Sequence, residues 1–401
     1  GEFVDYKGWG KTLPEQPYIF DLSSAEVKLD FKDREKVPIS ISGLFDGGAL
    51  QMAGHLNIFN GQYQFDFSLS EQNPSRWGHY VLPTAGYELR GAQLNMVGEM
   101  QSKSPFPKQG IPFNFNTTIT ATNSELKTPF FEEPIRQIAG TAQFNNTERL
   151  QFQILSMRGQ LHEQPFHGLG HFYLADSMVS LSFKSPKFEI STVDKLFPSL
   201  REWKLNGTGD GQAVLAGHLQ APAFTGYFET ETLSTAIGSI EDARVSFKRQ
   251  ESKLDLVAND GRFHQGTVSG KMHIQFQAPA PSTVQSSIRV QDINVSDFLP
   301  KRLSNHPYIK GDLSLELSGS DGRYNGSAEL TGTPLEIRNQ IIGSAKTSME
   351  VDKTDPNRPA SIHFRDIEIQ GMDGDSVMTG TGTLRDLTQL AFNVSGTQLS
   401  F

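Results

Sequence analysis

The sequence contains no cysteine and only 3 tryptophans among its 401 residues. Without cysteine the chain has no disulfide, no thiol nucleophile and no cysteine-ligated metal. Apolar residues make up 36% of the chain, below the roughly 45–50% of typical globular proteins. No apolar run approaches the roughly 18 residues with which a helix crosses a bilayer. The chain is therefore poor in core material and needs no covalent cross-link.

Positive charge is also in deficit, because 36 Lys and Arg face 45 Asp and Glu, which gives a net charge of −9. Such a chain has no overall electrostatic attraction to nucleic acid or to anionic lipid surfaces, and we expect no nucleic acid as a partner. No signal peptide precedes Glu2, and the chain stops at Phe401 inside a strand-like pattern. We therefore expect a part of a longer protein, with any anchor or targeting segment outside it.

What the sequence does contain is alternation of apolar and polar residues from end to end, as in Val27, Leu29 and Phe31 against Lys28 and Asp30. This period of two predicts strands with one apolar and one polar face. The steps Asn60-Gly61, Asp260-Gly261 and Asp321-Gly322 are typical of hairpin turns and predict an antiparallel meander. The fold class expected from the residues is thus all-β.

An internal repeat of about 100 residues is superimposed on the alternation. Its landmarks are an apolar-Pro step at Pro83, Pro198 and Pro300, a glycine that starts a strand at Gly54, Gly170, Gly270 and Gly382, and a small residue at Ala25, Gly140, Ala243 and Ala345. We expect four repeats, at 1–83, 84–198, 199–300 and 301–401, the first and last incomplete. Between the prolines at 198 and 300 the pattern predicts five or six strands, followed by a helical turn over residues 296–299.

A sheet with one apolar face must cover that face with a second sheet, close into a barrel, or form a groove for an apolar ligand. Tandem β-sandwiches also repeat at about 100 residues, but their units need about seven strands and usually a core tryptophan. The three tryptophans here share no repeat position. A tandem β-sandwich adhesin or cell-surface spacer remains the alternative.

The segment from Leu205 to Leu219 (LNGTGDGQAVLAGHL), followed by the strand from Ala243 to Phe247, resembles the TamB/AsmA-like proteins of diderm bacteria. The segment from Gly311 to Gly319 (GDLSLELSG) repeats the style. The resemblance covers essentially the whole chain as a repeat pattern. It implies an elongated, curved antiparallel β-sheet that forms a taco-shaped groove, built from repeats of about five strands plus a short linker.

The resemblance also implies a function, which is bridge-type lipid transfer in the periplasm, where the groove carries phospholipid acyl chains between the inner and outer membranes. The implied partners are a phospholipid or other acyl-chain ligand, the inner membrane through an N-terminal anchor, and an outer-membrane barrel protein. The inner membrane and the barrel protein would both be reached through regions that are missing here.

We assign the groove lining to the apolar members of the alternating stripes. The expected lipid-binding residues are Val27, Leu29, Phe31, Phe65, Phe67, Leu69, Phe113, Phe115, Ile119, Phe152, Ile154, Leu181, Phe183, Val245, Phe247, Leu254, Leu256, Ile274, Phe276, Leu313, Leu315, Met349, Val351, Phe364, Phe392 and Val394.

The residue types of catalytic and metal sites occur without the pattern that such sites need. His162 and His167 enclose Pro165, which would break the helix of a zinc-binding H-E-x-x-H motif. The glycines of residues 207–211 are not followed by the Lys-Ser/Thr of a phosphate loop. The carboxylate pairs at 132–133 and at 373 and 375 lack a positioned base. We expect no catalytic residue, no metal and no cofactor.

Overall fold

The structure is a computed structural model that describes residues 2–5, 18–73, 88–91, 93–103, 113–127, 133–146, 150–173, 176–192, 204–219, 221–235, 238–263, 265–276, 282–294, 308–320, 323–337, 340–355, 360–385 and 389–397. These residues form 24 β-strands and one 3-10 turn, η1 (Ile190–Thr192). All described strands belong to a single sheet, and every described pairing in it is antiparallel. The predicted all-β antiparallel fold is confirmed.

By its internal contacts the chain divides into two compact units. Unit 1 comprises Gly1–Pro186 and Gln212–Phe224, and unit 2 comprises Lys187–Gly211 and Thr225–Phe401. Strands β13 (Thr208–His218) and β14 (Ala223–Thr235) contribute residues to both.

The other strands of unit 1 are β1 (Glu2–Asp5), β2 (Tyr18–Leu29), β3 (Val37–Phe45), β4 (Gly48–Leu56), β5 (Tyr63–Gln72), β6 (Glu88–Arg90), β7 (Gln93–Ser102), β8 (Phe113–Lys127), β9 (Ile135–Asn145), β10 (Gln151–Leu161), β11 (Gln164–Tyr173) and β12 (Met178–Glu189), whose last residues belong to unit 2. Those of unit 2 are β15 (Gly238–Gln250), β16 (Lys253–Phe263), β17 (Gly266–Gln275), β18 (Thr283–Asn294), β19 (Tyr308–Ser320), β20 (Arg323–Ile337), β21 (Gln340–Lys353), β22 (Ser361–Gly371), β23 (Val377–Arg385) and β24 (Gln389–Thr397).

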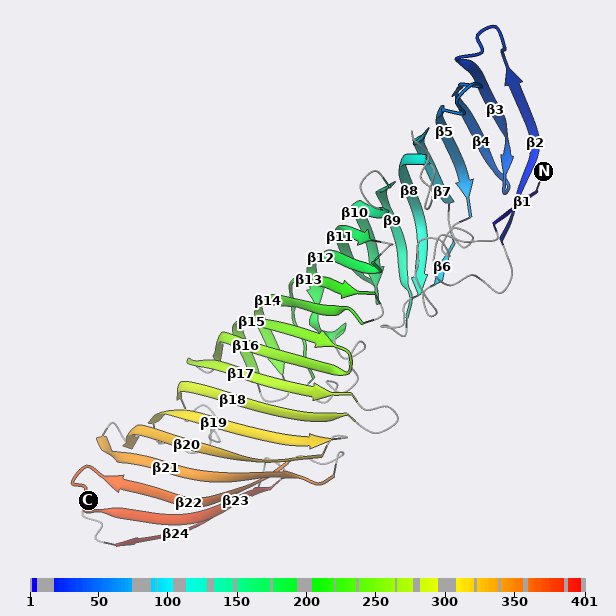
Figure 1. Cartoon of the computed structure of the whole chain (residues 1–401). Coiled ribbons are helices and arrows are strands. Elements are labelled where there is room, and N and C mark those ends of the chain that lie inside the picture. Colours follow the sequence, from blue (N-terminus) through cyan, green and yellow to red (C-terminus); the bar gives the residue numbers. More distant parts are fainter. Residues whose placement is uncertain are drawn as a thin grey trace. The chain divides into compact units, whose positions relative to one another are not determined.

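Strands that follow one another in sequence lie side by side, as the colour order in Figure 1 shows within each unit. In unit 1 the ladder runs from β2 to β5 and from β7 to β12; β5 pairs with β7 because the short β6 lies on the far end of β8. In unit 2 it runs from β15 to β24. These register-paired meanders contain no second sheet among the described residues, so the sandwich arrangement that the alternative requires is not found there.

Most of the long strands carry a β-bulge, a place where one extra residue shifts the register. Polar residues with positive φ occupy many of these places, including Asn123 (φ 52°), Asp260 (φ 58°) and Asp366 (φ 50°). Asn and Asp tolerate this left-handed conformation better than most residues, because their short side chains hydrogen-bond locally. Each bulge bends its strand. Because it adds one residue, the odd-numbered and even-numbered positions exchange faces beyond it, and the apolar face continues on the other set.

Three positive-φ residues share a further feature. Their backbone N–H groups each donate a hydrogen bond to a side-chain oxygen on a later strand. Glu71 donates to Asn95 Oδ1 at 3.0 Å, Lys187 to Asp210 Oδ1 at 3.3 Å, and Asp292 to Asp312 Oδ1 at 3.0 Å. Each donor lies on β5, β12 or β18, and each acceptor lies on β7, β13 or β19. The donors are 116 and 105 positions apart, close to the repeat length that the prolines indicate.

The expected repeat boundaries at residues 83, 198 and 300, and the helical turn over 296–299, lie outside the described residues. Between the latter two boundaries the structure has six strands, β13 to β18, in agreement with the five or six predicted. Asn60-Gly61 lies in the turn between β4 and β5, where the Gly61 N–H bonds to the Asn57 carbonyl at 2.9 Å. Asp321-Gly322 is not described.

The hairpin prediction at Asp260-Gly261 is wrong. Both residues lie inside β16, at the bulge where the register to β17 shifts between Ala258 and Gly261. An Asp with positive φ followed by glycine serves a bulge as well as a turn. The local sequence alone does not distinguish the two.

Candidate functional site

One face of the sheet is apolar in both units, and we call it the inner face. It carries Leu69, Met96 and Ile119 in unit 1 and Leu254 and Ile274 in unit 2, which are central to buried apolar clusters. Directly opposed residues of an antiparallel pair share a face. Starting from these five residues, the register of each strand pair therefore identifies the inner-face positions of the next strand.

In unit 1 an unbroken inner-face row crosses ten strands, from β2 to β12. Its members, each opposite the next, are Val27, Ile41, Met52, Phe67, Gly98, Thr117, Phe144, Phe152, Phe172 and Val179. None of them is charged. The neighbouring inner-face rows of unit 1, as far as the structure describes them, contain no charged residue either.

Phenylalanine rings form a ladder within this face. The ring centroids of Phe113 and Phe115 are 6.2 Å apart, those of Phe115 and Phe144 4.7 Å, and those of Phe144 and Phe152 6.2 Å. The ladder continues from Phe152 to Phe172 at 6.3 Å. These spacings are those of favourable aromatic pairs. The ladder joins β8, β9, β10 and β11 with a surface that has no polar interruption among these five rings.

Glycines on the inner face make room for such rings. Directly opposed glycine–aromatic pairs are Gly54 with Phe65, Gly168 with Phe183, Gly319 with Tyr324 and Gly382 with Phe392. A Cβ added to these glycines would lie 2.6, 3.1, 2.7 and 2.2 Å from the ring, respectively. The ring thus covers the bare backbone of its partner.

Unit 2 repeats the arrangement over nine strands, from β15 to β23. Its central inner-face row contains Phe247, Leu256, Met272, Ser286, Leu317, Gly326, Val351, Ile362 and Leu384. The row is again free of charge.

All but two of the residues expected to line the groove lie at inner-face positions of their own unit, and Phe31 and Val394 are described separately. Phe31 follows β2 in a turn and is exposed. For Val394 only the backbone is described, and it is opposite Gly380. The structure thus places the predicted set on one face within each unit, and contact with a ligand stays a prediction.

The predicted residues differ in accessibility. Leu254 and Ile274 are 0% and 1% exposed, so they pack beneath their neighbours. Val27 and Leu29, on β2 of unit 1, are exposed by 54% and 49%, and Phe392, on β24 of unit 2, is exposed by 52%. The accessible members are the ones suited to touch a ligand directly.

Alternation alone missed several inner-face residues that follow a bulge or begin a strand. Among them are Ile293, Gln72, Ser124 and Val37, all nearly or fully buried, and the fully buried Ile190 of η1 was missed as well. In β18 the inner face passes from Val290 to Ile293 across the bulge at Asp292. A sequence signal for Ser124 and Ile293 does exist. It is an Asn or Asp after which the apolar residues of a strand move from odd to even positions, or the reverse.

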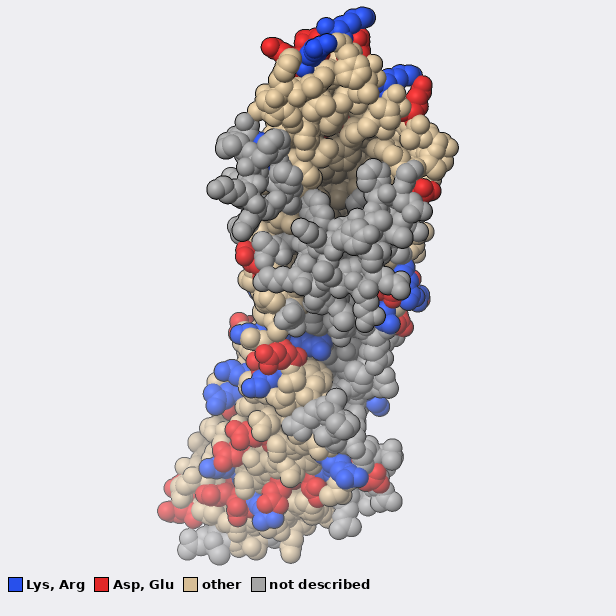
Figure 2. Space-filling model, turned by 45° about the vertical axis from the view of Figure 1, so that its right-hand side comes forward, with Lys and Arg blue, Asp and Glu red and all other residues tan. Residues whose placement is uncertain are grey.

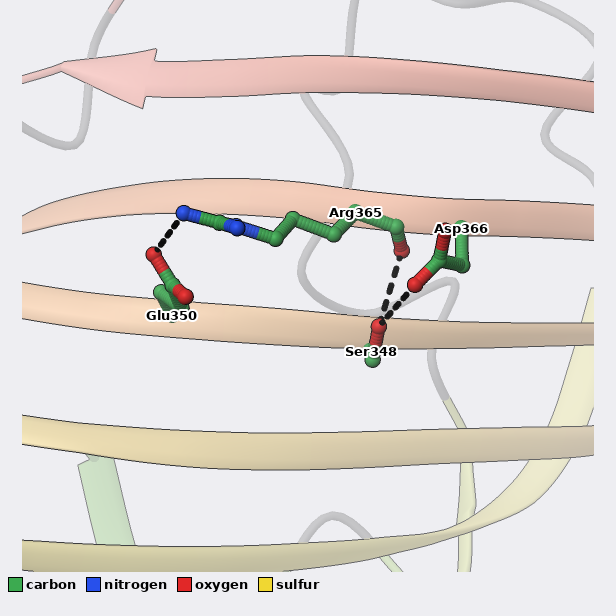
Figure 3. Close-up of polar contacts among 4 residues, drawn as sticks. All are labelled: Ser348, Glu350, Arg365 and Asp366. Atoms are coloured by element: carbon green, nitrogen blue, oxygen red, sulfur yellow. Dashed lines mark hydrogen bonds and ion pairs between the residues drawn. The ribbon is translucent and has the colours of Figure 1, made fainter.

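The opposite face, which we call the outer face, is polar, and ion pairs and hydrogen bonds join side chains of neighbouring strands on it. Figure 3 shows one group on β21 and β22, where Arg365 and Glu350 form an ion pair. The Ser348 hydroxyl lies 3.2 Å from both the Arg365 carbonyl oxygen and the Asp366 carboxylate. Since Asp366 is a bulge residue, these polar contacts support the bend from outside.

The histidines of β11 lie on this outer face, as the alternation predicts, with the rings of His171 and Tyr173 stacked at 6.1 Å. The described residues contain no group of three or more His, Asp or Glu arranged to hold a metal ion. Among them there is also no helix with the length and apolar character needed to span a membrane.

Figure 2 shows that the N-terminal part of the molecule, at the top of the view, is hollowed. The visible wall of this hollow consists of uncharged residues, and the charged side chains of that part lie on its rim and outside. This agrees with the absence of charge from the central inner-face row of unit 1 and from the rows beside it, as far as the structure describes them.

Comparison with known proteins gave no match to a family model, to a curated protein or to a solved structure.

Proposed function

We propose that this chain binds the acyl chains of lipids along its inner face and passes them between membranes, as a periplasmic bridge-type lipid transfer protein with no catalytic step. The observation that carries the proposal is the continuous, uncharged inner-face row in each unit, ten strands wide in unit 1 and nine in unit 2. A polar ligand would need fixed donors and acceptors, and these rows offer almost none.

The size of the inner face suits acyl chains. From Ala243 to Arg249 along β15, the inner face spans six residue steps, or about 20 Å at about 3.4 Å per residue. The hydrocarbon core of a bilayer is about 30 Å thick, so the chains of one leaflet reach about 15 Å. One acyl chain therefore fits along a strand.

The energetics favour movement as well as binding. Each CH₂ group removed from water contributes about 0.8 kcal/mol, and this term has no preferred direction. A lining of phenylalanine, leucine and bare glycine backbone lets a chain shift from one strand to the next without breaking a hydrogen bond. Repeated strands thus supply a path and not a single pocket.

The destination of the lipid rests on the resemblance to the TamB/AsmA-like proteins. On that basis the protein bridges the inner and outer membranes of a diderm bacterium, with an inner-membrane anchor and an outer-membrane barrel partner supplied by regions beyond this chain. Acyl chains would lie on the inner face, and head groups would stay in water at its edge.

The test is native mass spectrometry with lipid extraction, on the chain purified from a diderm host. We expect several phospholipids per chain. Leu315→Glu places a charge on the inner face, opposite Ile288 and Ala328, and should lower the number bound. Ser314→Glu, the adjacent outer-face change, is the matched control and should leave it unchanged.

Phe247 is a poorer site for the same experiment. It packs against the buried Leu254, Ile274 and Val284, so a charge there would loosen the fold itself. Circular dichroism of each variant checks that Leu315→Glu stays folded. A wild-type chain that carries no lipid and takes up no fluorescent acyl probe would refute the proposal.

A further inference from the structure

One inner-face row of unit 2 differs from the others by carrying charge. This row, the edge row, lies at the strand ends and consists of Arg249, Leu254, Ile274, Val284, Gly319, Tyr324 and Lys353, each opposite the next. Arg249 and Lys353 are its two termini. Among the register-paired inner-face positions that the structure describes in unit 2, they are the only charged residues.

Each of the two cations lies over an aromatic ring of the same face. The Arg249 Cζ is 5.5 Å from the centroid of Phe276, and the Lys353 Nζ is 5.9 Å from that of Tyr324. Both rings pack on the cluster of Leu254, Ile274 and Val284. The long side chains thus cover apolar surface with their stems and carry the charge toward the strand ends, where water begins.

The Arg249 side chain is only partly in contact with water. Burial lowers the pKa of the Arg249 guanidinium, which shows that the charge is partly desolvated. The other charges of these strands lie on the outer face, as Lys248 does next to Arg249. A methionine would cover the same apolar cluster, so the apolar contacts alone do not account for a cation at these two places.

We propose that Arg249 and Lys353 bind the anionic head groups of lipids whose acyl chains occupy the inner face of unit 2. This inference rests on the proposed acyl-chain binding. Six strand spacings of about 4.8 Å separate the two residues, or about 29 Å, so they form two successive stations. Arginine and lysine both bind phosphate well, arginine through two parallel hydrogen bonds. With a net charge of −9, the chain repels anions elsewhere, so any preference for them must be local.

The test measures displacement of the uncharged dye Nile red by two ligands with the same chain, hexadecyl phosphate and 1-O-hexadecylglycerol. We expect the wild-type chain to bind the phosphate several-fold more tightly. The double variant Arg249→Met, Lys353→Met should lower this ratio to about one while it keeps binding of the glycerol ether. The control Lys248→Met, Arg323→Met removes two exposed outer-face cations and should retain the ratio. Added salt should reduce the wild-type preference.

The other outcomes are equally informative. Equal affinity of the wild-type chain for both ligands, or an unchanged ratio in the double variant, overturns this inference and leaves acyl-chain binding intact. Loss of both ligands in the double variant shows that the two side chains serve packing instead. Displacement by inorganic phosphate alone shows a site for free phosphate and not for a lipid. Failure of the wild-type chain to bind Nile red or either ligand overturns the proposed function as well.

Discussion

Glycine and aromatic residues meet across the strands of this protein at several inner-face positions, and this pairing gives some of the 37 glycines and 28 phenylalanines a structural role. Glycine in a strand is normally unfavourable, because its backbone loses more entropy on folding than that of other residues and it has no side chain to pack. Here the opposing ring supplies the packing. The same pairs keep the inner face smooth, because neither partner offers a polar atom from its side chain.

Gly54 gives the sharpest test of this pairing. A Cβ at this position would lie 2.0 Å from the Gln64 carbonyl oxygen as well as 2.6 Å from the Phe65 ring. Because the carbonyl belongs to the backbone, it cannot move aside, and Gly54→Ala should destabilise the fold by about 1–3 kcal/mol. The midpoint of urea unfolding measures this loss. Ala53→Ser, on the exposed outer face next to it, should stay within about 0.5 kcal/mol; equal midpoints for the two variants would contradict the steric argument.

At the scale of elements, the bulges and the side chains that cap them join successive groups of strands. Asn95, Asp210 and Asp312 each accept the N–H of a positive-φ residue on the strand that precedes an undescribed segment. A sheet interrupted by a linker could slip in register when it resumes. The hydrogen bond from the positive-φ residue fixes that register at each of the three places, and at Glu71 and Asp292 the donor lies in a bulge.

Asp312 is the cap best suited to a substitution series. Asp312→Ala leaves the Asp292 N–H without its acceptor and should cost about 1 kcal/mol. Asp312→Asn keeps an oxygen at the same place and should recover most of the loss. Urea unfolding compares stability, and amide exchange at Asp292 reports the bond directly. If the Asp292 amide exchanges no faster in either variant than in the wild-type chain, the cap contributes nothing.

The elements themselves were largely predictable from the sequence, because alternation reports which side chains share a face. The bulges were not, because an Asp or Asn within a strand looks like the start of a turn. Asp260 was misread for this reason. Ile293 and Ser124 escaped the candidate lining because a bulge reverses their parity. The distinction between the buried Leu254 and the accessible Leu29 also lay beyond the pattern, since both occupy equivalent alternating positions.

At the scale of the whole molecule, a path built from repeated strands should hold lipid in proportion to its extent. A chain that ends at residue 294 keeps β1 to β18 and lacks the six strands β19 to β24. We expect it to carry roughly a quarter fewer lipid copies than the full chain by native mass spectrometry. A monodisperse elution profile must accompany the count, because the cut exposes the edge of β18. Complete loss of lipid, or no loss at all, would instead indicate one discrete pocket.

The order of the strands has a consequence for how the protein is made. Every described strand pairing joins strands that are neighbours in sequence or separated by a single strand, so no segment waits for a distant partner. Contacts of this kind give a low contact order and favour rapid local folding. Each hairpin can add to the edge left by the one before it as the chain leaves the ribosome or a secretion channel. A growing chain of this type always presents one open edge, and the next strand to emerge is the one that covers it.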